Sequence, residues 1–379
     1  MDFNWTKEYL DLFTANRIFA ETSLHRAEDP PGFAWEKWRA CGKQGVLGMP
    51  LPTKYGGQGV SFLGTTGAFE ALGQGGGDRG FLFSVGAHLF GCALPIARHG
   101  NQTQHERYLP DLSSGKAVAA LAITEPHCGS SVSEMATTAV KTPTGYRLDG
   151  AKMFVTNGGD ASLFLVIATE APQRNAMGLT AFLVPSNVEG LTTETLPSSG
   201  MPLAPMSRVC FERCHIPEDS VVGKNCGGFA ILISAMQTER TAILAAFLGA
   251  AERDLSFCVD RMKQRTDYKG KLYAHQAVAH RLARMKTQLE SARWMLYRGA
   301  WEVDNGHDAT TWSAMTKYTV SETIVECALE VLRTLAGAGW LDEFGSASAL
   351  RDVVGTLSAS GTSDNQLNTI AAGLTKTLQ

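Results

Sequence analysis

One carboxylate interrupts the apolar face of a long helix that the periodicity predicts in the last third of the chain. Leu232, Met236, Glu239, Ile243 and Phe247 recur at steps of three and four residues, which places Glu239 among apolar side chains. Burial raises the pKa of a carboxyl group, as a general base for a weakly acidic C–H proton requires. Two structural alternatives stay open: a partly buried ion pair with another element, or a kinked helix from which Glu239 reaches solvent.

A second chemical feature is the segment TEPHCGSS at residues 124–131, which leaves an expected strand through a proline turn. Its small and hydroxylated residues allow backbone N–H groups and hydroxyls to approach a flat polar ring or an anion. A plain surface loop of a β domain has the same composition, so this segment alone does not identify a ligand.

No metal site is expected from the cysteines. The sequence contains 8 of them without a Cys-x-x-Cys pair, so neither a disulfide framework nor a zinc site is indicated. Cys210, Cys214 and His215 come nearest to ligand spacing, but they lie in an alternating segment that is typical of a buried or edge strand.

Composition and charge exclude several classes of protein. The 379 residues allow two to three domains, and 44% hydrophobic with 19% charged residues is typical of a globular chain. The formal net charge of -3 argues against a nucleic-acid protein or a polybasic membrane binder. The longest apolar run, Thr241–Ala251, is too short to cross a bilayer, and Asp2 and Glu8 interrupt any secretory signal. A cytoplasmic protein is expected.

Three zones of different periodicity follow one another. Residues 1–116 have helical spacing, for example at Phe69–Leu72 and Phe81–Ile96. Residues 117–222 change to short β-rich runs, expected at Val118–Thr124, Tyr146–Asp149, Met153–Thr156, Leu163–Thr169, Leu179–Val184 and Arg208–Phe211. Residues 223–379 return to long helices, expected at Phe229–Lys263, His275–Asn305, Ala309–Leu335 and Ser363–Thr377. The sequence therefore predicts an α+β multidomain fold with an N-terminal α-helical domain, a middle β-barrel or sandwich domain and a C-terminal four-helix bundle.

Several motifs in this order resemble the acyl-CoA dehydrogenase family of flavoproteins. They are AITEPHCGSS at 122–131, YRLDGAKMFVTNGGDAS at 146–162, CFERCHIPEDSVVG at 210–223, TLAGAGWLDEF at 334–344 and LRDVVGTLSASGTSDNQ at 350–366. The turn from Arg265 to Gln276 resembles the connection between the first two bundle helices of that family. The resemblance covers nearly the whole chain and implies the same order of domains.

The resemblance implies that FAD is the cofactor and that two sets of residues hold it. Ile123, Thr124 and Ser130 would approach the edge of the isoalloxazine, Phe154 would pack on the ring, and Thr156 would hydrogen-bond near N5. A second set would bind the FAD of a neighbouring chain: Arg265, Tyr268, Gln276, Arg333 and Gly337. Thr362 would contact the FAD side of the active site, and Asp364 stands where a glutamine often contacts the flavin. A homo-oligomer, dimer or tetramer, is therefore implied.

The expected catalytic base departs from the usual position in the family. Most members have a glutamate before the Gly-Thr of the last turn, where this chain has Ser360. A minority branch instead has its glutamate on the first bundle helix, just before an arginine, and this chain has Glu239 and Arg240 there. The resemblance thus makes Glu239 the base and implies that Ser130, Arg240 and Ser360 contact the substrate. Other departures are Ala336, where a glycine is usual, and Asp364, where a glutamine is frequent.

The implied reaction is the α,β-dehydrogenation of an acyl thioester. Glu239 would remove the α-proton while the β-hydrogen leaves as hydride to flavin N5. An acyl-CoA with an electron-transfer flavoprotein as acceptor is the first expectation. The alternative is an acyl or aminoacyl group, for example prolyl, on a carrier protein, with oxygen as a further possible acceptor.

Two readings from other classes are weaker. Some relatives are flavin-bearing proteins that associate with DNA through a basic C-terminal region, but residues 341–379 contain only Arg351 and Lys376 against four acidic residues. A helical scaffold without flavin is weaker still. No nucleic-acid or membrane partner is expected.

Overall fold

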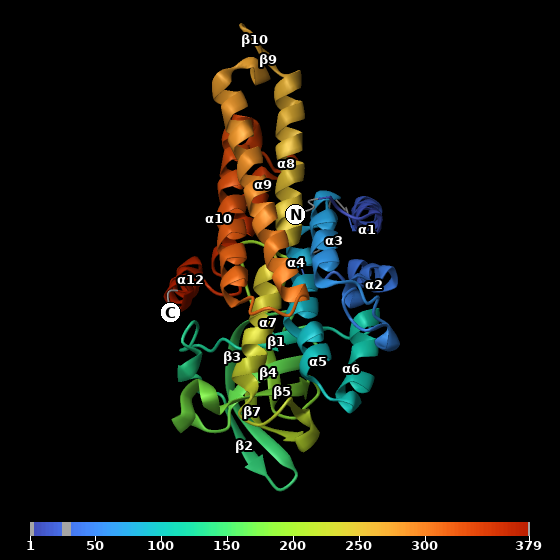
Figure 1. Cartoon of the computed structure of the whole chain (residues 1–379), viewed down its shortest axis with the longest axis vertical. Helices are drawn as coiled ribbons and strands as arrows, with labels where there is room; N and C mark the ends of the chain where they lie inside the picture. Colours follow the sequence, from blue (N-terminus) through green and yellow to red (C-terminus); the bar gives the residue numbers. More distant parts are fainter. Residues whose placement is uncertain (1–3, 25–31, 378–379) are drawn as a thin grey trace.

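The structure, a computed structural model, describes residues 4–24 and 32–377. Its first part is helical. The elements are α1 (Lys7–Phe19), α2 (Trp35–Gln44), α3 (Phe62–Gln74), α4 (Arg79–His88), the π-helical turn η4 (Leu89–Ala93), α5 (Leu94–His99) and α6 (Gln102–Ser114). These helices lie beside the lower half of the C-terminal bundle (Figure 1).

Side-chain caps set the starts of the helices that form the inner part of this domain. Ser61 Oγ accepts a hydrogen bond from the Gly64 N–H at 3.0 Å, and Asp78 Oδ1 accepts one from the Phe81 N–H at 2.8 Å. Each satisfies a backbone donor that the first helical turn leaves free.

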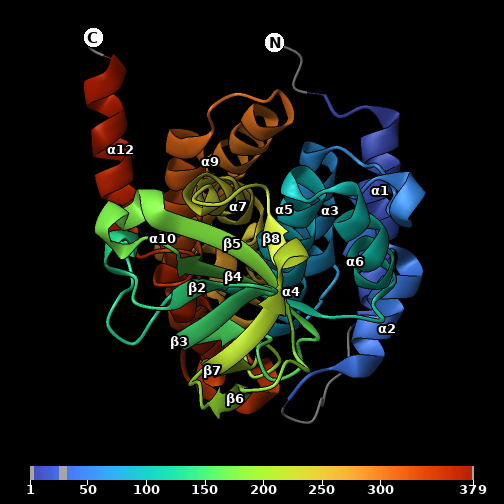
Figure 2. The ribbon, with the colours of Figure 1, turned by 90° about the horizontal axis from the view of Figure 1, so that it is seen from below.

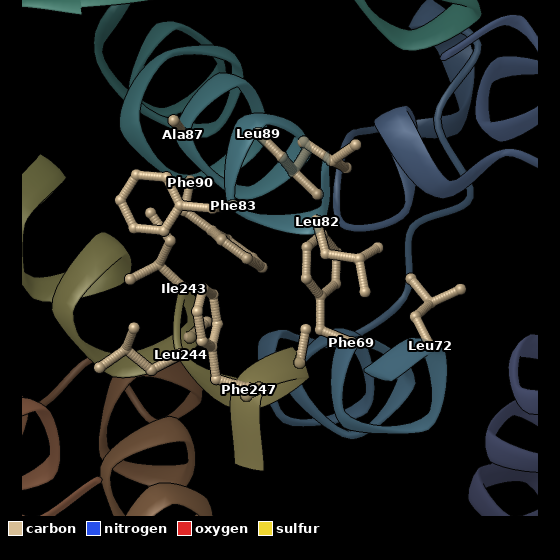
Figure 3. Packing of buried hydrophobic residues seen from close by; sticks show 14 of the residues in the cluster. Phe69, Leu72, Leu82, Phe83, Ala87, Leu89, Phe90, Ile243, Leu244 and Phe247 are labelled. Atoms are coloured by element: carbon tan, nitrogen blue, oxygen red, sulfur yellow. The ribbon is translucent and has the colours of Figure 1, made fainter. Parts of the chain in front are cut away.

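The segment Arg79–His99 has the length and hydropathy of a membrane span, but 89% of its most apolar window is buried inside the protein. It is a core segment here. Figure 3 shows its side chains Phe83 and Phe90 packed against Ile243 and Phe247 of the bundle.

The middle part is a β structure. Its strands are β1 (Ala119–Ala122), β2 (Thr138–Thr142), β3 (Gly145–Thr156), β4 (Leu163–Thr169), β5 (Leu179–Pro185), β6 (Leu191–Leu196), β7 (Met206–Pro217) and β8 (Val221–Val222). Within the described residues they pair in the order β6-β7-β3-β2-β4-β5-β8, with β1 parallel to β4. Figure 2 shows these strands fanned below the bundle.

The sheet folds over on itself. β2 and β4 meet at one pair only, Thr138 with Thr169, and the inner faces on either side enclose a second apolar core. In that core the rings of Tyr146 on β3 and Phe182 on β5 lie 5.1 Å apart. This arrangement confirms a middle sheet of the expected barrel or sandwich type.

Two details of the strand prediction were wrong. Tyr146–Asp149 and Met153–Thr156 form one strand, β3, because irregularities in its pairing with β7 carry it past Gly150 without ending it. β2 and β6 were missed because their polar and exposed residues give no apolar alternation. The segment with Cys210 and Cys214, expected as a buried or an edge strand, is the interior strand β7, which pairs with β3 on one side and β6 on the other.

The last part is the helical bundle. Its helices are α7 (Gly228–Ala242), α8 (Ala245–Gln264), α9 (Gln276–Asp304), α10 (Thr310–Leu335), α11 (Ser346–Val354) and α12 (Ser363–Thr377). A short hairpin of β9 (Thr266–Asp267) and β10 (Gly270–Lys271) joins α8 to α9 at the end of the bundle farthest from the sheet (Figure 1).

The single helix expected over Phe229–Lys263 is interrupted, which corrects that prediction. α7 ends at Ala242 and α8 begins at Ala245, with Leu244 at φ -91 and ψ 0 between them. Ile243 and Leu244 are both buried in the core between α3, α4 and the bundle (Figure 3). Neither is a helix breaker, so local sequence gave no signal, and tertiary packing determines the interruption.

Close backbone contact fixes α8 against α3. A Cβ on Gly73 would lie 1.7 Å from the carbonyl oxygen of Ala246, and one on Gly249 would lie 1.9 Å from that of Glu70. The two helices therefore approach at a distance that only glycine permits, which anchors the bundle next to the carboxylate of α7.

Candidate active site

Glu239 lies in the last turn of α7 and is buried, with 8% of its surface exposed. The apolar stripe found in the sequence is therefore a buried face, and the helix interruption after Ala242 does not bring the carboxylate to solvent. Among the described residues no lysine or arginine nitrogen lies within ion-pair distance of it. Within the described residues, Glu239 therefore neither forms an ion pair with another element nor reaches solvent through a kinked helix.

The turn after α11 supplies the hydrogen-bond donor to Glu239. Ser360 Oγ donates to Glu239 Oε1 at 2.5 Å, and Arg240 Nε donates to the Ser360 carbonyl at 3.0 Å. Ser360 has a positive φ of 53, and Gly361 follows at 96. The expected base Glu239 and two of the three expected substrate-binding residues, Arg240 and Ser360, therefore form one connected group, which does not include Ser130.

Gln366 fastens the same turn from its other side, and sequence reasoning missed it. This buried side chain donates from Nε2 to the carbonyls of Gly361 at 3.1 Å and of Thr362 at 3.4 Å. Thr362 is exposed and accepts a hydrogen bond from the Asn365 N–H at the start of α12. Asp364 is exposed in the first turn of that helix.

The π-helical turn η4 lies against the other carboxylate oxygen. A Cβ on Gly91 would come within 2.8 Å of Glu239 Oε2 and 3.5 Å of the Leu121 side chain on β1. Next to the carboxylate, Thr238 Oγ1 donates to the Phe90 carbonyl at 3.0 Å, which ties α7 to η4. Gly91 thus leaves the space that Glu239 occupies, and no periodic pattern signals it.

Burial sets the acidity of Glu239. Desolvation raises the pKa of this carboxyl above its usual value, while the Ser360 hydrogen bond and the Arg240 charge lower it by less. A raised pKa makes the carboxylate a better proton acceptor, which suits abstraction of a carbon-bound proton.

The segment after β1 and the last residues of β3 carry the residues expected at the flavin edge. The Met153 N–H donates to the Thr124 carbonyl at 2.7 Å, which brings the two strands together beside Phe154. Phe154 has a φ of 57 and is 61% exposed, an unusual state for a large aromatic side chain. The hydroxyls of Thr124 and Thr156 have no partner in the described part of the chain.

A buried ion pair holds this edge in place, and no local sequence pattern indicates it. Lys152 Nζ lies 2.8 Å from Glu125 Oε1 and donates to the Ile123 carbonyl at 2.9 Å. Glu125 in turn accepts hydrogen bonds from the N–H groups of Ala136 and Thr137. These contacts fix the start of the loop that carries Ser130, which is itself exposed.

The cofactor residues expected to act on a neighbouring chain's FAD lie far from Glu239. Arg265, Tyr268 and Gln276 surround the β9-β10 hairpin, at the opposite end of the bundle from the sheet (Figure 1). Tyr268 is 90% exposed. One chain therefore does not bring both sets of residues to one ligand, as the resemblance to an oligomeric family implies.

A cationic pocket of about 480 Å³ lies beside this second set, between α9 and α10. It is lined by Ala277, His280, Arg281, Arg284, Glu330 and Arg333. Arg281 Nε pairs with Glu330 Oε2 at 2.8 Å, and Arg333 pairs with the same carboxylate. Arg333 was expected from the resemblance, whereas His280, Arg281 and Arg284 were not.

The residues present fit FAD. A flavin needs a flat apolar surface with nearby hydroxyls, and a pyrophosphate needs fixed cations. Phe154 with Thr124 and Thr156 offers the first, and the pocket of Arg281, Arg284 and Arg333 offers the second. Gly337 is exposed near the same end of α10, after Ala336, whose φ of 53 explains why a glycine is usual there.

The described residues contain no group of three or more His, Cys, Asp or Glu side chains placed to hold a metal ion. Cys214 is buried in β7, and His215 on the same strand is exposed. The segment therefore has the alternation of an ordinary strand.

Comparison with known proteins identifies one family along nearly the whole chain. Models of the N-terminal, middle and C-terminal domains of acyl-CoA dehydrogenase match residues 6–116, 120–214 and 227–375. An L-prolyl-(peptidyl-carrier protein) dehydrogenase of Pseudomonas fluorescens is 37% identical over 99% of this chain and 100% of its own length.

Two solved structures are similar in fold. The prolyl acyl carrier protein oxidase AnaB has a TM-score of 0.96 at 33% identity, covering 98% of this chain and 100% of its own. PigA with FAD and proline has a TM-score of 0.95 at 32% identity, covering 99% of each chain. The chain therefore belongs to the acyl-CoA dehydrogenase family and is a flavin oxidoreductase that uses FAD and acts on CH–CH groups of acyl thioesters.

Proposed function

We propose that this chain oxidises an aminoacyl thioester, prolyl first among the candidates, that is attached to a carrier protein, with Glu239 as the base. One observation carries the catalytic part: a buried carboxylate of raised pKa that a serine hydroxyl holds in place. The substrate part rests on relatives of 32 to 37% identity whose names specify a prolyl group on a carrier protein.

Glu239 takes the α-proton of the thioester in this proposal. FAD, when bound, supplies a hydride acceptor at N5 for the β-hydrogen, so that one α,β double bond forms as two electrons leave the substrate. The hydrogen bond from Ser360 orients Oε1, which leaves Oε2, the oxygen beside Gly91, as the atom that receives the proton.

The thioester carbonyl gains negative charge as the α-proton leaves, so it needs a donor nearby. We assign this role to the backbone N–H of Ser360, because the side chain of the same residue contacts the base. Arg240 and Gln366 fix the carbonyls of the same turn, which keeps the donor preorganised.

Two chains would form each cofactor site. Phe154 and Thr156 act on the flavin of their own chain, whereas Arg265, Gln276 and the cationic pocket act on the phosphates and adenine side of a neighbour's FAD. The support is distance, since the two sets lie at opposite ends of the bundle (Figure 1). Sedimentation of the holoenzyme tests this, because a monomer that retains FAD contradicts it.

The cytoplasmic location is a prediction from the sequence.

The electron acceptor in this proposal is an electron-transfer flavoprotein or oxygen. Relatives of both kinds exist: some are named as dehydrogenases and one as an oxidase. Oxygen consumption during turnover, measured with and without an electron-transfer flavoprotein, separates the two acceptors.

Anaerobic mixing of the holoenzyme with two substrate panels tests the substrate proposal. One panel holds carrier proteins loaded with prolyl or other aminoacyl groups, and the other holds acyl-CoA esters of different chain lengths. We expect the flavin absorbance to be lost rapidly with the prolyl carrier protein. Bleaching by CoA esters alone would eliminate the carrier-protein proposal and leave the acyl-CoA alternative.

A further inference from the structure

A buried lysine of α10 has no role in the reaction described so far. Lys317 is 1% exposed, and its side chain is among the largest that the protein buries completely. Burial of an ammonium group is costly unless it has a partner. No carboxylate in the described ranges lies within ion-pair distance of Lys317, so its contact must be sought elsewhere.

The contact is a backbone carbonyl next to the active-site turn. Lys317 Nζ donates to the Leu357 carbonyl at 3.0 Å. Leu357 ends η11 (Gly355–Leu357), the continuation of α11, where carbonyls without helical partners attract a positive charge. Three residues later comes Ser360, the donor to Glu239.

Two cations therefore hold the two ends of one short segment. Lys317 binds the carbonyl of Leu357, and Arg240 binds the carbonyl of Ser360. Between them the chain must turn into the positive φ of Ser360, a conformation that a serine adopts only when its surroundings impose it. Loss of either cation would free one end of the segment.

We propose that Lys317 is a positioning residue for proton abstraction. Its protonated side chain holds Leu357, and through this segment keeps the Ser360 hydroxyl aligned with Glu239. This inference rests on the proposed function of Glu239 as base, but it assigns to Lys317 no contact with substrate or cofactor.

The environment of Lys317 adds a pH dependence. Burial is the main cause that lowers the pKa of this ammonium group to about 8; Glu322 on the same helix opposes the shift, and the Arg240 charge adds to it. Arg240 is the charged group acting on it from the helices packed against α10 within the described residues. A neutral amine is a weaker donor than an ammonium group. Alignment should therefore weaken as the pH rises through this range.

Two substitutions separate positioning from simple packing. K317R keeps a charge that does not titrate, and K317M keeps an apolar side chain of similar length without any donor. Lys116→Met, at an exposed site in the N-terminal domain, is the matched control. For each holoenzyme we would measure the anaerobic rate of flavin reduction at saturating substrate across pH, together with FAD content and thermal midpoint.

The expected results are specific. K317M should slow flavin reduction about tenfold with FAD still bound, as a small misplacement of a catalytic group does. K317R should restore most of the rate and move the alkaline limb of the profile to higher pH, and K116M should match the wild type. In a Ser360→Ala background K317M should have little further effect, because both act through the same hydroxyl.

Other outcomes overturn the proposal. They are a wild-type rate in K317M, an alkaline limb that stays in place in K317R, or a K317M loss that is undiminished in the Ser360→Ala background. The wild-type enzyme and Glu239→Gln in the same series report separately on the proposed function, since absence of flavin reduction in the wild type would refute that function and not the role of Lys317.

Discussion

The Ser360 hydroxyl lies 2.5 Å from Glu239 Oε1 across a separation of 121 residues. By the family resemblance, Ser360 stands where most members would have their catalytic glutamate, and Glu239 stands at the alternative position of a minority branch. The two positions thus face one another across the same small volume. A carboxylate can enter this volume from α7 or from the turn after α11, which explains how one reaction accommodates both arrangements.

Substitution of Ser360 should change the pH dependence of the reaction. The Ser360 hydrogen bond stabilises the carboxylate form of Glu239 and lowers its pKa, while burial raises it. Ser360→Ala removes the lowering contribution, so the folded-state pKa rises and the base is protonated over a wider acidic range. The acid limb of flavin reduction should move to higher pH. An unchanged limb would mean that this hydroxyl does not act on the base.

Relocation of the base should restore part of the activity. In Glu239→Ala the acceptor is lost, and Ser360→Glu in the same chain introduces a carboxylate from the opposite side of the site. We expect the double variant to reduce its flavin at least about tenfold faster than Glu239→Ala alone, because general-base catalysis contributes at least about a hundredfold. Equal rates for both variants would show that position 360 does not reach the α-proton.

Gly91 should be intolerant of a methyl group. An alanine Cβ there would lie 2.8 Å from Glu239 Oε2, so the carboxylate must shift. We expect Gly91→Ala to lower the rate of flavin reduction by about tenfold or more without loss of FAD. Gly67→Ala on α3 is the control, because its nearest neighbour would be an ordinary 3.5 Å contact. A wild-type rate in Gly91→Ala would contradict the close approach of η4 to the base.

His88 should make the fold sensitive to acid. Its Nδ1 accepts the Ala119 N–H at 3.0 Å, so Nε2 carries the proton toward the Leu112 carbonyl. Burial lowers the pKa of this imidazole to about 4 from an ordinary 6.5. The unfolded chain therefore takes up the proton first as the pH falls.

The stabilising contribution of neutral His88 is complete above pH 6.5 and is lost as the pH falls toward 4. This change lowers the free energy of unfolding by up to about 3 kcal/mol. Urea unfolding at several pH values, with His88→Gln as the comparison, measures this. Equal pH slopes in both proteins would rule out His88 as the source.

More of the fold than of the candidate site could be predicted from the sequence. Helical and strand periodicity predicted three zones, and Glu239 was visible because one carboxylate broke an apolar stripe. The interruption at Ile243 and Leu244 could not be predicted, since two ordinary helix residues are displaced only by packing against α3 and α4.

The residues that hold Glu239 and the Ser360 turn in place could not be predicted from local sequence patterns either. Gly91 and Lys317 act on Glu239 or on the Ser360 turn from distant elements, and Gln366 acts on that turn from the helix that follows it; no local pattern distinguishes any of the three. Arg281 and Arg284 became candidate ligand-binding residues only because α9 and α10 place them in one pocket with Arg333. Sequence periodicity identifies a buried face, but the partner of that face comes from the tertiary structure.

Anaerobic flavin reduction in Glu239→Gln is the direct test of Glu239 as the catalytic base. Glutamine preserves size and accepts the Ser360 hydrogen bond but does not take a proton, so the rate with an accepted thioester should fall by about 100-fold or more while FAD stays bound. Glu194→Gln, at an exposed carboxylate on β6, should reduce its flavin as the wild type does. Flavin reduction at the wild-type rate in Glu239→Gln would show that Glu239 is not the base.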